Sequence, residues 1–85
     1  MVYVDESVFP FRNQMYCHMY SPDVEELHQM ARAIGLKRAW FQNKRGRNFP
    51  HYDLSPTKRA AAIAAGATAV TCRELVQIVR NKIIV

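Results

Sequence analysis

Glycine and cysteine are scarce in this sequence, and each shortage excludes a class of protein. The three glycines, Gly35, Gly46 and Gly66, lie too far apart to form a glycine-rich phosphate-binding loop. Cys17 and Cys72 are too few for a disulfide scaffold. Together with the three histidines they show neither the C-x2-C nor the H-x3-H spacing of a structural zinc site, so we expect no zinc and no other cofactor.

The chain also lacks the segments that would send it into a membrane or out of the cell. No apolar run approaches the ~20 residues that are needed to cross a bilayer, so we expect no membrane partner. The first residues, MVYVDESVF, have neither the basic region nor the long apolar region of a secretory signal, which makes the cytoplasm the expected location. With 85 residues, 49% of them hydrophobic, we expect a single folded domain over residues 1–85.

Two short strands are predicted near the N-terminus. Residues 2–4 are an apolar run followed by two acidic residues, which is typical of a short buried strand. Residues 9–13 contain a proline and an asparagine and predict a turn or loop. The apolar and aromatic residues 15–20 (MYCHMY) predict a second strand, paired with the first.

The next segment carries the signals of a helix. Ser21 can accept a hydrogen bond from the free N–H groups of a first turn, and Pro22 suits the first helical position. Acidic residues follow in the first turns, where the helix dipole favours them, and Gly35 is suited to end the helix. The buried stripe expected from the three-to-four spacing consists of Val24, Leu27, Met30, Ala31 and Ile34.

A second and a third helix are predicted in the C-terminal half. Ser55 and Pro56 repeat the Ser-Pro start, for a helix that continues to residue 65 and is followed by a glycine. Thr71 and Glu74 form a capping box for the third helix. The remaining expectations are a buried stripe of Leu75, Ile78 and Val79 in this helix, short strands at residues 39–42 and 67–70, a basic loop at 43–50, and a final strand or tail at 83–85.

Predicted strands and helices alternate along the chain, most clearly over residues 55–82. This order favours parallel strand pairing with right-handed crossovers. The sequence therefore predicts an α/β fold, in which a small single layer of short, partly parallel strands has about three helices packed on it.

Positive charge is concentrated in the middle of the chain. Residues 37–59 hold seven of the twelve lysines and arginines and one acidic residue, in a chain with a net charge of +5. Cations interleaved with aromatic rings suit phosphate oxygens and stacked bases, so the segment predicts a phosphate-bearing ligand, either a nucleic acid or a nucleotide. The alternative is a solvated connection anchored by a few aromatic residues. The cations are Lys37, Arg38, Lys44, Arg45, Arg47, Lys58 and Arg59, and the rings are Trp40, Phe41, Phe49, His51 and Tyr52.

The motif HYDLSPTKR, residues 51–59, brings several of these side chains to a helix N-terminus. Free N–H groups at that position favour a phosphate, whereas cations in a first turn oppose the helix dipole and need another reason, such as an anionic ligand. The structural alternative is that Tyr52 and Leu54 are core residues and that the cations are solvated. The predicted ligand site consists of Lys44, Arg45 and Arg47 as loop contacts and of His51, Tyr52, Asp53, Lys58 and Arg59 as its more rigid part.

A metal-dependent phosphohydrolase or nuclease is the alternative function. Asp5 ends the first predicted strand, at the edge where α/β sheets bind ligands, and Asp5, Glu6 and Asp53 could hold Mg²⁺ or Mn²⁺ there through oxygen ligands. The hydrolase would use Asp5, Asp53 and His51. Such sites usually have more carboxylates than this chain can assemble, so the leading interpretation is a binding domain without metal or catalysis. A third alternative, from a different class, is a phage or bacterial protein-interaction module with a protein partner.

Two further residue sets have simpler explanations. Trp40, the single tryptophan, is expected in the core rather than in a stacking surface. Cys17 and His18 are the residue types of a nucleophile and its base, but neighbours on a strand point to opposite faces, so we expect no dyad.

Several motifs in order resemble those of one family. They are VYVDESV at the start, then MYCHM, ELH, IGL and WFQ, and above all HYDLSPTKR followed by A-x-x-x-G-A. Over nearly the whole chain they are similar to a family of small bacterial and phage proteins, the domain of unknown function 4031. The resemblance implies a phage or bacterial cytoplasmic protein, and it supplies no activity, cofactor or catalytic residue. It also implies that His51, Tyr52, Asp53, Lys58 and Arg59 belong to the family's motif, whereas the loop NKRGRN departs from the more proline-rich loop of the family.

Overall fold

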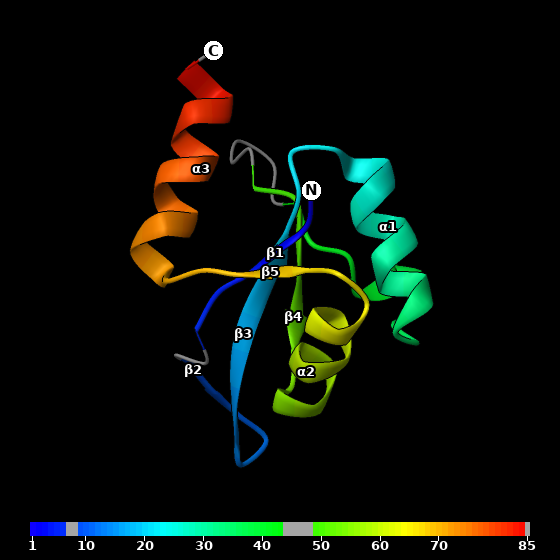
Figure 1. Ribbon diagram of the computed structural model, residues 1–85. Coiled ribbons are helices and arrows are strands. Elements are labelled where there is room, and N and C mark those ends of the chain that lie inside the picture. The colour runs from blue at the N-terminus through cyan, green and yellow to red at the C-terminus, as the bar shows by residue number, and fades with distance from the viewer. Residues whose placement is uncertain (7–8, 44–48, 85) are drawn as a thin grey trace.

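The structure, a computed structural model, describes residues 1–6, 9–43 and 49–84, with the side chains of the last helix described as far as residue 81 (Figure 1). This part of the chain forms a five-stranded mixed sheet with three α-helices and one short 3-10 helix. The strands are β1 (Tyr3–Val4), β2 (Phe9–Phe11), β3 (Gln14–Tyr20), β4 (His51–Leu54) and β5 (Thr68–Ala69). The helices are α1 (Val24–Ala33), the 3-10 helix η1 (Arg38–Trp40), α2 (Pro56–Ala64) and α3 (Cys72–Ile84).

The longest strand, β3, organises the sheet. It pairs antiparallel with β1, β2 and β4, and β1 pairs parallel with β5. The predicted pairing of the first strand with residues 15–20 is therefore confirmed, with Tyr3 opposite Tyr20. The chain passes from β4 through α2 to β5, so the parallel part of the sheet follows the expected helical connection. The predicted fold class, a small α/β layer with partly parallel strands and three helices, is confirmed.

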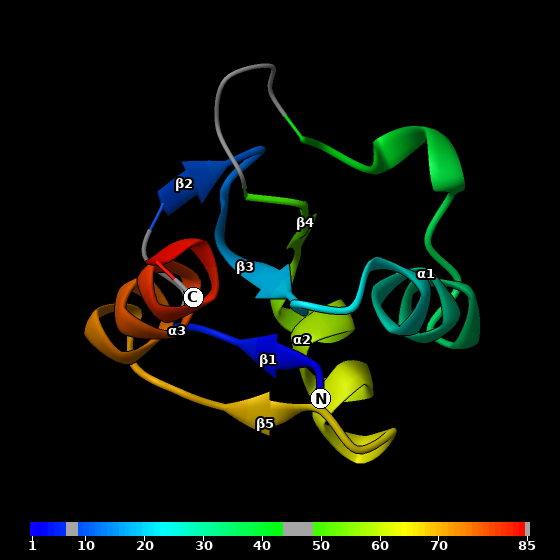
Figure 2. The ribbon, with the colours of Figure 1, turned by 90° about the horizontal axis from the view of Figure 1, so that it is seen from above.

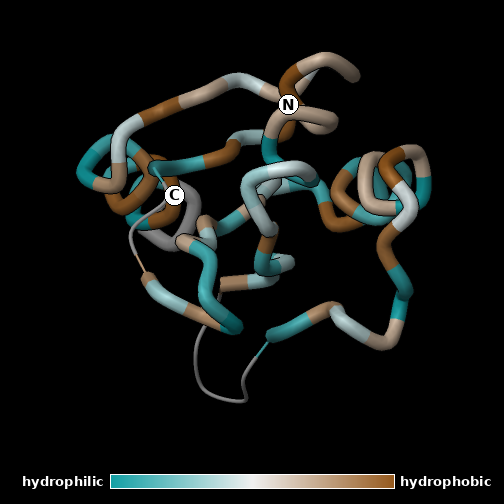
Figure 3. The backbone as a smooth tube through the Cα atoms, turned by 90° about the horizontal axis from the view of Figure 1, so that it is seen from below, coloured by the Kyte–Doolittle hydropathy of each residue, from teal (hydrophilic) through white to brown (hydrophobic). Residues whose placement is uncertain are grey.

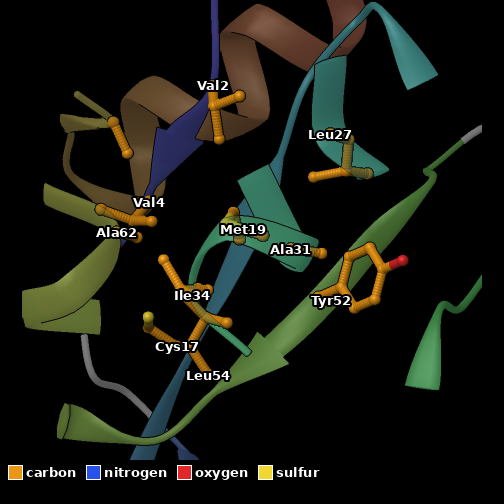
Figure 4. Packing of buried hydrophobic residues seen from close by; sticks show 11 residues of the cluster. Val2, Val4, Cys17, Met19, Leu27, Ala31, Ile34, Tyr52, Leu54 and Ala62 are labelled. Carbon is orange, nitrogen blue, oxygen red and sulfur yellow. The ribbon is translucent and has the colours of Figure 1, made fainter. Parts of the chain in front are cut away.

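One face of the sheet is apolar, and two helices cover it. Side chains alternate between the two faces of a strand, and β3 places Cys17 and Met19 on one face and Tyr16, His18 and Tyr20 on the other. α1 and α2 lie on the Cys17 side, since their residues Leu27, Ala31 and Ala62 share the core with Cys17. α3 lies on the opposite side of the sheet from α1 and α2 (Figure 2). Figure 4 shows the resulting core between the strands and the two helices. It consists of Val2, Val4, Cys17, Met19, Leu27, Ala31, Ile34, Tyr52, Leu54, Ala62 and Ala67.

Capping side chains begin α2 and α3 as the sequence predicts. Ser55 Oγ accepts the N–H of Lys58 at 3.3 Å, and Pro56 is the first residue of α2. Before α3, Glu74 Oε1 accepts the N–H of Thr71 at 2.8 Å, and Thr71 Oγ1 accepts the N–H of Glu74 at 3.0 Å. This reciprocal pair is the predicted capping box.

The start of α1 differs from the prediction. Asp23 caps the helix, because its carboxylate accepts two N–H groups of the first turn. Ser21 instead accepts the N–H of Asp23 at 3.1 Å. This local turn competes with helix formation, so the helix begins at Val24 rather than at Pro22.

The buried side of α1 includes a histidine that the predicted stripe omits. Leu27 and Ala31 are buried as expected, but Val24 is 38% exposed and His28 is only 6% exposed. The Nδ1 atom of His28 lies 2.8 Å from the Tyr52 hydroxyl, which gives the buried imidazole a hydrogen-bond partner. Figure 3 shows hydrophobic and hydrophilic residues alternating around α1, in agreement with one buried and one solvated side.

The predicted strand at residues 39–42 is wrong. Its first two residues lie in η1, and Gln42 alone forms a β-bridge, with His51. Trp40, expected in the core, is 50% exposed. The 3-10 turn follows the end of α1 and carries the tryptophan out of the sheet, where Lys37 lies over its ring at 5.6 Å.

Three further segments differ in secondary structure from the prediction. Residues 9–13, expected as a loop, form β2 and then a turn in which two consecutive residues have positive φ angles of 49° and 63°. Residues 51–54, expected only as part of a site, form β4. α3 continues to Ile84, where a final strand or a tail was expected at residues 83–85. None of the helices in the described ranges combines the length and apolar character required to cross a membrane.

Candidate functional site

The sheet face opposite α1 and α2, which we call the polar face, carries a cluster of four titratable side chains. His18 on β3 lies directly opposite Asp53 on β4. The N–H of Asp5, just after β1, donates to the carbonyl oxygen of His18 at 3.1 Å. His51 precedes Asp53 by two residues on β4, so its side chain points to the same face. Strand pairing therefore brings Asp5, His18, His51 and Asp53 together, and this group is the candidate site.

The Asp5 carboxylate holds His18 in one orientation. Asp5 is 3% exposed, and its carboxylate accepts the main-chain N–H of His18 at 2.6 Å and lies 2.9 Å from ring atom Nδ1. Because the carboxylate accepts, Nδ1 carries a proton and Nε2 is the nitrogen left free to bind. The same hydrogen bond raises the pKa of the His18 imidazole above its ordinary value, against the opposing effect of burial.

His51 is oriented by a main-chain group. Its Nδ1 lies 2.8 Å from the carbonyl oxygen of Phe49, and the two rings are stacked with centroids 4.3 Å apart. A carbonyl oxygen can only accept, so Nδ1 donates and Nε2 carries no proton in the neutral ring. Burial lowers the pKa of His51, which favours that neutral form.

Asp53 is oriented by an amide and faces His51. The Gln42 side chain donates from Nε2 to Asp53 Oδ2 at 2.6 Å. The second carboxylate oxygen, Oδ1, lies 3.5 Å from Nε2 of His51. The bridge between Gln42 and β4 places this amide beside the carboxylate, so an isolated β-bridge contributes directly to the geometry of the site.

The cluster is reachable from solvent and can bind a cation. The side chains of His18 and Asp53 are 28% and 31% exposed, and that of His51 is 13% exposed. One ring nitrogen of each histidine and one oxygen of Asp53 all lie within 4.8 Å of one another. Imidazole nitrogens and a carboxylate at such distances can hold a divalent metal ion or exchange protons with a bound ligand.

A row of aromatic rings continues from the cluster toward the β2–β3 turn. The ring centroid of Phe9 lies 5.0 Å from that of His18 and 6.1 Å from that of Tyr16. Phe11 follows, 5.2 Å from Tyr16. At the end of the row, Phe11 is 50% exposed and the Arg12 guanidinium lies 5.2 Å from its ring centroid.

Three residues of the predicted ligand site have partners within the protein. Tyr52 is 1% exposed and points into the core, because it lies on the other face of β4 from its neighbours. Lys58 Nζ donates to the carbonyl oxygen of Ile34 at 2.7 Å, at the C-terminal end of α1, where a cation is favoured. Arg59 Nε donates to the carbonyl oxygen of Asp5 at 2.8 Å. These two hydrogen bonds explain the presence of Lys58 and Arg59 in the first turn of α2 without a ligand.

The other residues of that prediction are divided between the cluster and the undescribed part of the chain. His51 and Asp53 lie in the cluster. Asp5, considered as a metal ligand, joins them through His18 rather than directly. The loop cations Lys44, Arg45 and Arg47 lie outside the described residues.

Sequence reasoning missed His18 and Gln42 as site residues. The alternation of side chains along a strand could have identified His18. It excludes a Cys17–His18 dyad because it places the two side chains on opposite faces, and with Cys17 in the core it turns His18 to the other face. Burial raises the pKa of the Cys17 thiol to about 12, so this thiol stays protonated in the core. The role of Gln42 depends on its bridge to β4 and has no local signal in the sequence.

A family model for proteins of unknown function matches residues 2–82, a range that includes every residue of the cluster. The chain belongs to the DUF4031 family. No curated protein and no solved structure matches the sequence. The function proposed for this DUF4031 protein therefore rests on its fold and on the cluster.

Proposed function

We propose that this DUF4031 protein binds a phosphate-bearing ligand, a nucleic acid or a nucleotide, and that single-stranded nucleic acid suits its polar face best. The observation that carries the proposal is the row of aromatic rings on the sheet face opposite α1 and α2, the side on which α3 lies. Unpaired bases stack on aromatic side chains whatever their sequence, whereas a duplex hides its base surfaces.

The rings form a row with an accessible end. Phe11, Tyr16, Phe9 and His18 follow one another at centroid separations of 5.2, 6.1 and 5.0 Å. Phe11, at the outer end, is 50% exposed. The apolar core of the protein lies on the other face of the sheet and does not need this ring. An exposed ring that continues a row of others offers a surface on which a base of the ligand can stack.

Positive charge is available for the phosphates. Arg12 is exposed and lies over the Phe11 ring, so a base on that ring would carry its phosphate near the guanidinium. Lys44, Arg45 and Arg47 precede Phe49 in the sequence, and the whole chain has a net charge of +5. Cation–phosphate contacts supply the part of nucleic-acid affinity that does not depend on sequence.

Removing the exposed ring together with its cation should weaken binding. We expect the double variant Phe11→Ala/Arg12→Ala to raise the Kd for a labelled single-stranded oligonucleotide about tenfold or more, since stacking contributes ~1–3 kcal/mol per base. Fluorescence anisotropy at several salt concentrations measures both the Kd and its salt dependence. Loss of the arginine should reduce the salt slope by about one counterion.

Trp40 and Lys37 provide a matched control. Trp40 is 50% exposed, as Phe11 is, and Lys37 lies over its ring at 5.6 Å, but this pair is on η1 next to α1. The double variant Trp40→Ala/Lys37→Ala should bind as the wild type does. Equal losses in both double variants would contradict the assignment to the polar face. If no oligonucleotide binds even at low salt, nucleic acid is excluded and the protein-interaction alternative gains.

The same titrations test the predicted loop contacts. A variant with Lys44, Arg45 and Arg47 all replaced by alanine should bind more weakly and lose about one counterion of salt dependence per residue. Unchanged affinity of this variant for DNA, RNA and nucleotides would remove the three cations from the proposal.

Metal-dependent phosphoester hydrolysis is the second candidate function, and the cluster at the inner end of the row favours it. The predicted set of Asp5, Asp53 and His51 is changed at one position. The Asp5 carboxylate is hydrogen-bonded to His18, so His18 replaces Asp5 beside the ion. Cleavage of a single-stranded oligonucleotide that requires Mn²⁺ or Zn²⁺ and disappears in Asp53→Asn would support it. Absence of cleavage with either ion, in a protein that binds the ion, would leave binding as the function.

A further inference from the structure

Two hydrogen-bond acceptors face each other at the centre of the cluster. Nε2 of His51 and Oδ1 of Asp53 are 3.5 Å apart. Because Nδ1 of His51 donates to the Phe49 carbonyl, the neutral ring presents a lone pair at Nε2. A lone pair and a carboxylate oxygen repel each other unless a hydrogen-bond donor or a cation lies between them, and a proton, a water molecule or a metal ion can take that place.

Each of the three partly buried members of the cluster is held by a partner of its own. The partner occupies one of the two possible ligand atoms, Nδ1 of each imidazole or Oδ2 of the carboxylate, and leaves the other available. Metal-binding imidazoles and carboxylates are typically fixed in this way by an outer carboxylate, carbonyl or amide. The pairs are Asp5 with His18, the Phe49 carbonyl with His51, and Gln42 with Asp53.

We propose that His18, His51 and Asp53 bind one divalent transition-metal ion, through Nε2 of both rings and one carboxylate oxygen. Two imidazoles and one carboxylate are a ligand set found in catalytic zinc sites and in other divalent transition-metal sites. Three protein ligands leave a further coordination position for water or for an oxygen of a ligand. The site shares His18 with the row of rings, and the hydrolase alternative rests on it. Metal binding is tested with the ion alone, so its failure is distinguishable from a failure of nucleic-acid binding.

The distances suit an ion after a small movement of one side chain. A tetrahedral ion with bonds of ~2.1 Å holds its ligand atoms about 3.4 Å apart. The Asp53 and His51 atoms are already at 3.5 Å, and one ring nitrogen of each histidine and one Asp53 oxygen lie within 4.8 Å of one another. The remaining approach is at most about 1.4 Å, which rotation about side-chain bonds provides. The 28% exposure of the His18 side chain leaves a path for the ion.

Isothermal titration of the metal-free full chain with ZnCl₂ at neutral pH tests the site, with Co²⁺ absorption as a report on coordination. We expect one equivalent of Zn²⁺ to bind with a micromolar or tighter Kd. His18→Gln and His51→Gln should each weaken binding about tenfold or more, and Gln42→Ala, which keeps all three ligands, should weaken it about tenfold. The spectrum of bound Co²⁺ should be that of a four- or five-coordinate ion.

A buried imidazole outside the cluster gives the control. His28 is bonded to Tyr52 in the core, so the double variant His28→Leu/Tyr52→Phe removes a histidine without touching the cluster and should bind Zn²⁺ as the wild type does. Millimolar or unsaturable binding by the wild type would overturn the proposal. So would an unchanged Kd in both His18→Gln and His51→Gln. If circular dichroism shows that these two variants do not fold, an unchanged Kd for Zn²⁺ in Gln42→Ala would also overturn the proposal.

Discussion

Replacing Asp5 by alanine should lower the free energy of unfolding by about 2–4 kcal/mol, because two hydrogen bonds to a buried carboxylate are lost together. Asp5 is 3% exposed and accepts both the main-chain N–H and the ring N–H of His18. Alanine leaves the main-chain N–H of His18 without this acceptor inside the sheet, which adds the cost of an unsatisfied buried donor. Urea denaturation followed by circular dichroism measures the change.

The neighbouring acid provides the control for this prediction. Glu6 is exposed, and its carboxylate accepts the N–H of Cys72 at the start of α3 at 3.1 Å. We expect Glu6→Ala to cost about 1 kcal/mol or less, as the loss of one exposed cap does. Equal destabilisation by Asp5→Ala and Glu6→Ala would show that the buried carboxylate does not stabilise the fold as we describe.

Acid should destabilise the wild-type protein more than a variant that lacks the buried imidazole. Burial lowers the pKa of His28 below its ordinary value of 6.5, with Arg38 acting in the same direction and Glu25 opposing it. Between the lowered pKa and 6.5 the unfolded chain binds more protons than the folded chain, so stability falls as the pH falls through this range. The loss attributable to one such group is at most about 1.4 kcal/mol per pH unit.

The double variant His28→Leu/Tyr52→Phe isolates this effect. Replacing both partners of a buried hydrogen bond by apolar groups of similar shape is close to neutral, so the two proteins should have similar stabilities at pH 7. At pH 5 the variant should be the more stable one. The raised pKa of His18 acts with the opposite sign, but it is present in both proteins and cancels in the comparison. Parallel stability curves between pH 7 and pH 5 would contradict the prediction.

Local signals predicted the helices well. Ser55, Pro56 and the Thr71–Glu74 box begin α2 and α3 as expected, because a cap and its first turn are close together in the chain and need no tertiary contact. The observed start of α1 differs from the predicted one because Ser21 and Asp23 can both cap a helix, and the local sequence does not decide between two neighbouring caps.

Strands were harder to predict, and so was the meaning of the cations. β2 and β4 are short and depend on pairing with β3, so residues 9–11 and 51–54 show little strand character by themselves. Lys58 and Arg59 looked unexplained in the first turn of α2 because their acceptors, on Ile34 and Asp5, are distant in the sequence.

The sequence by itself determined the α/β class, the helix starts of α2 and α3, the concentration of positive charge and the family of this protein. Only the tertiary structure decided the candidate site. Hydrogen bonding between β3 and β4 sets a register with His18 opposite Asp53, and a shift of one residue would turn His18 and His51 to different faces. Register is a property of strands that are far apart in the chain, so no local pattern contains it. This register places His51 and Asp53 of the motif HYD in the cluster, and Tyr52 between them lies in the core.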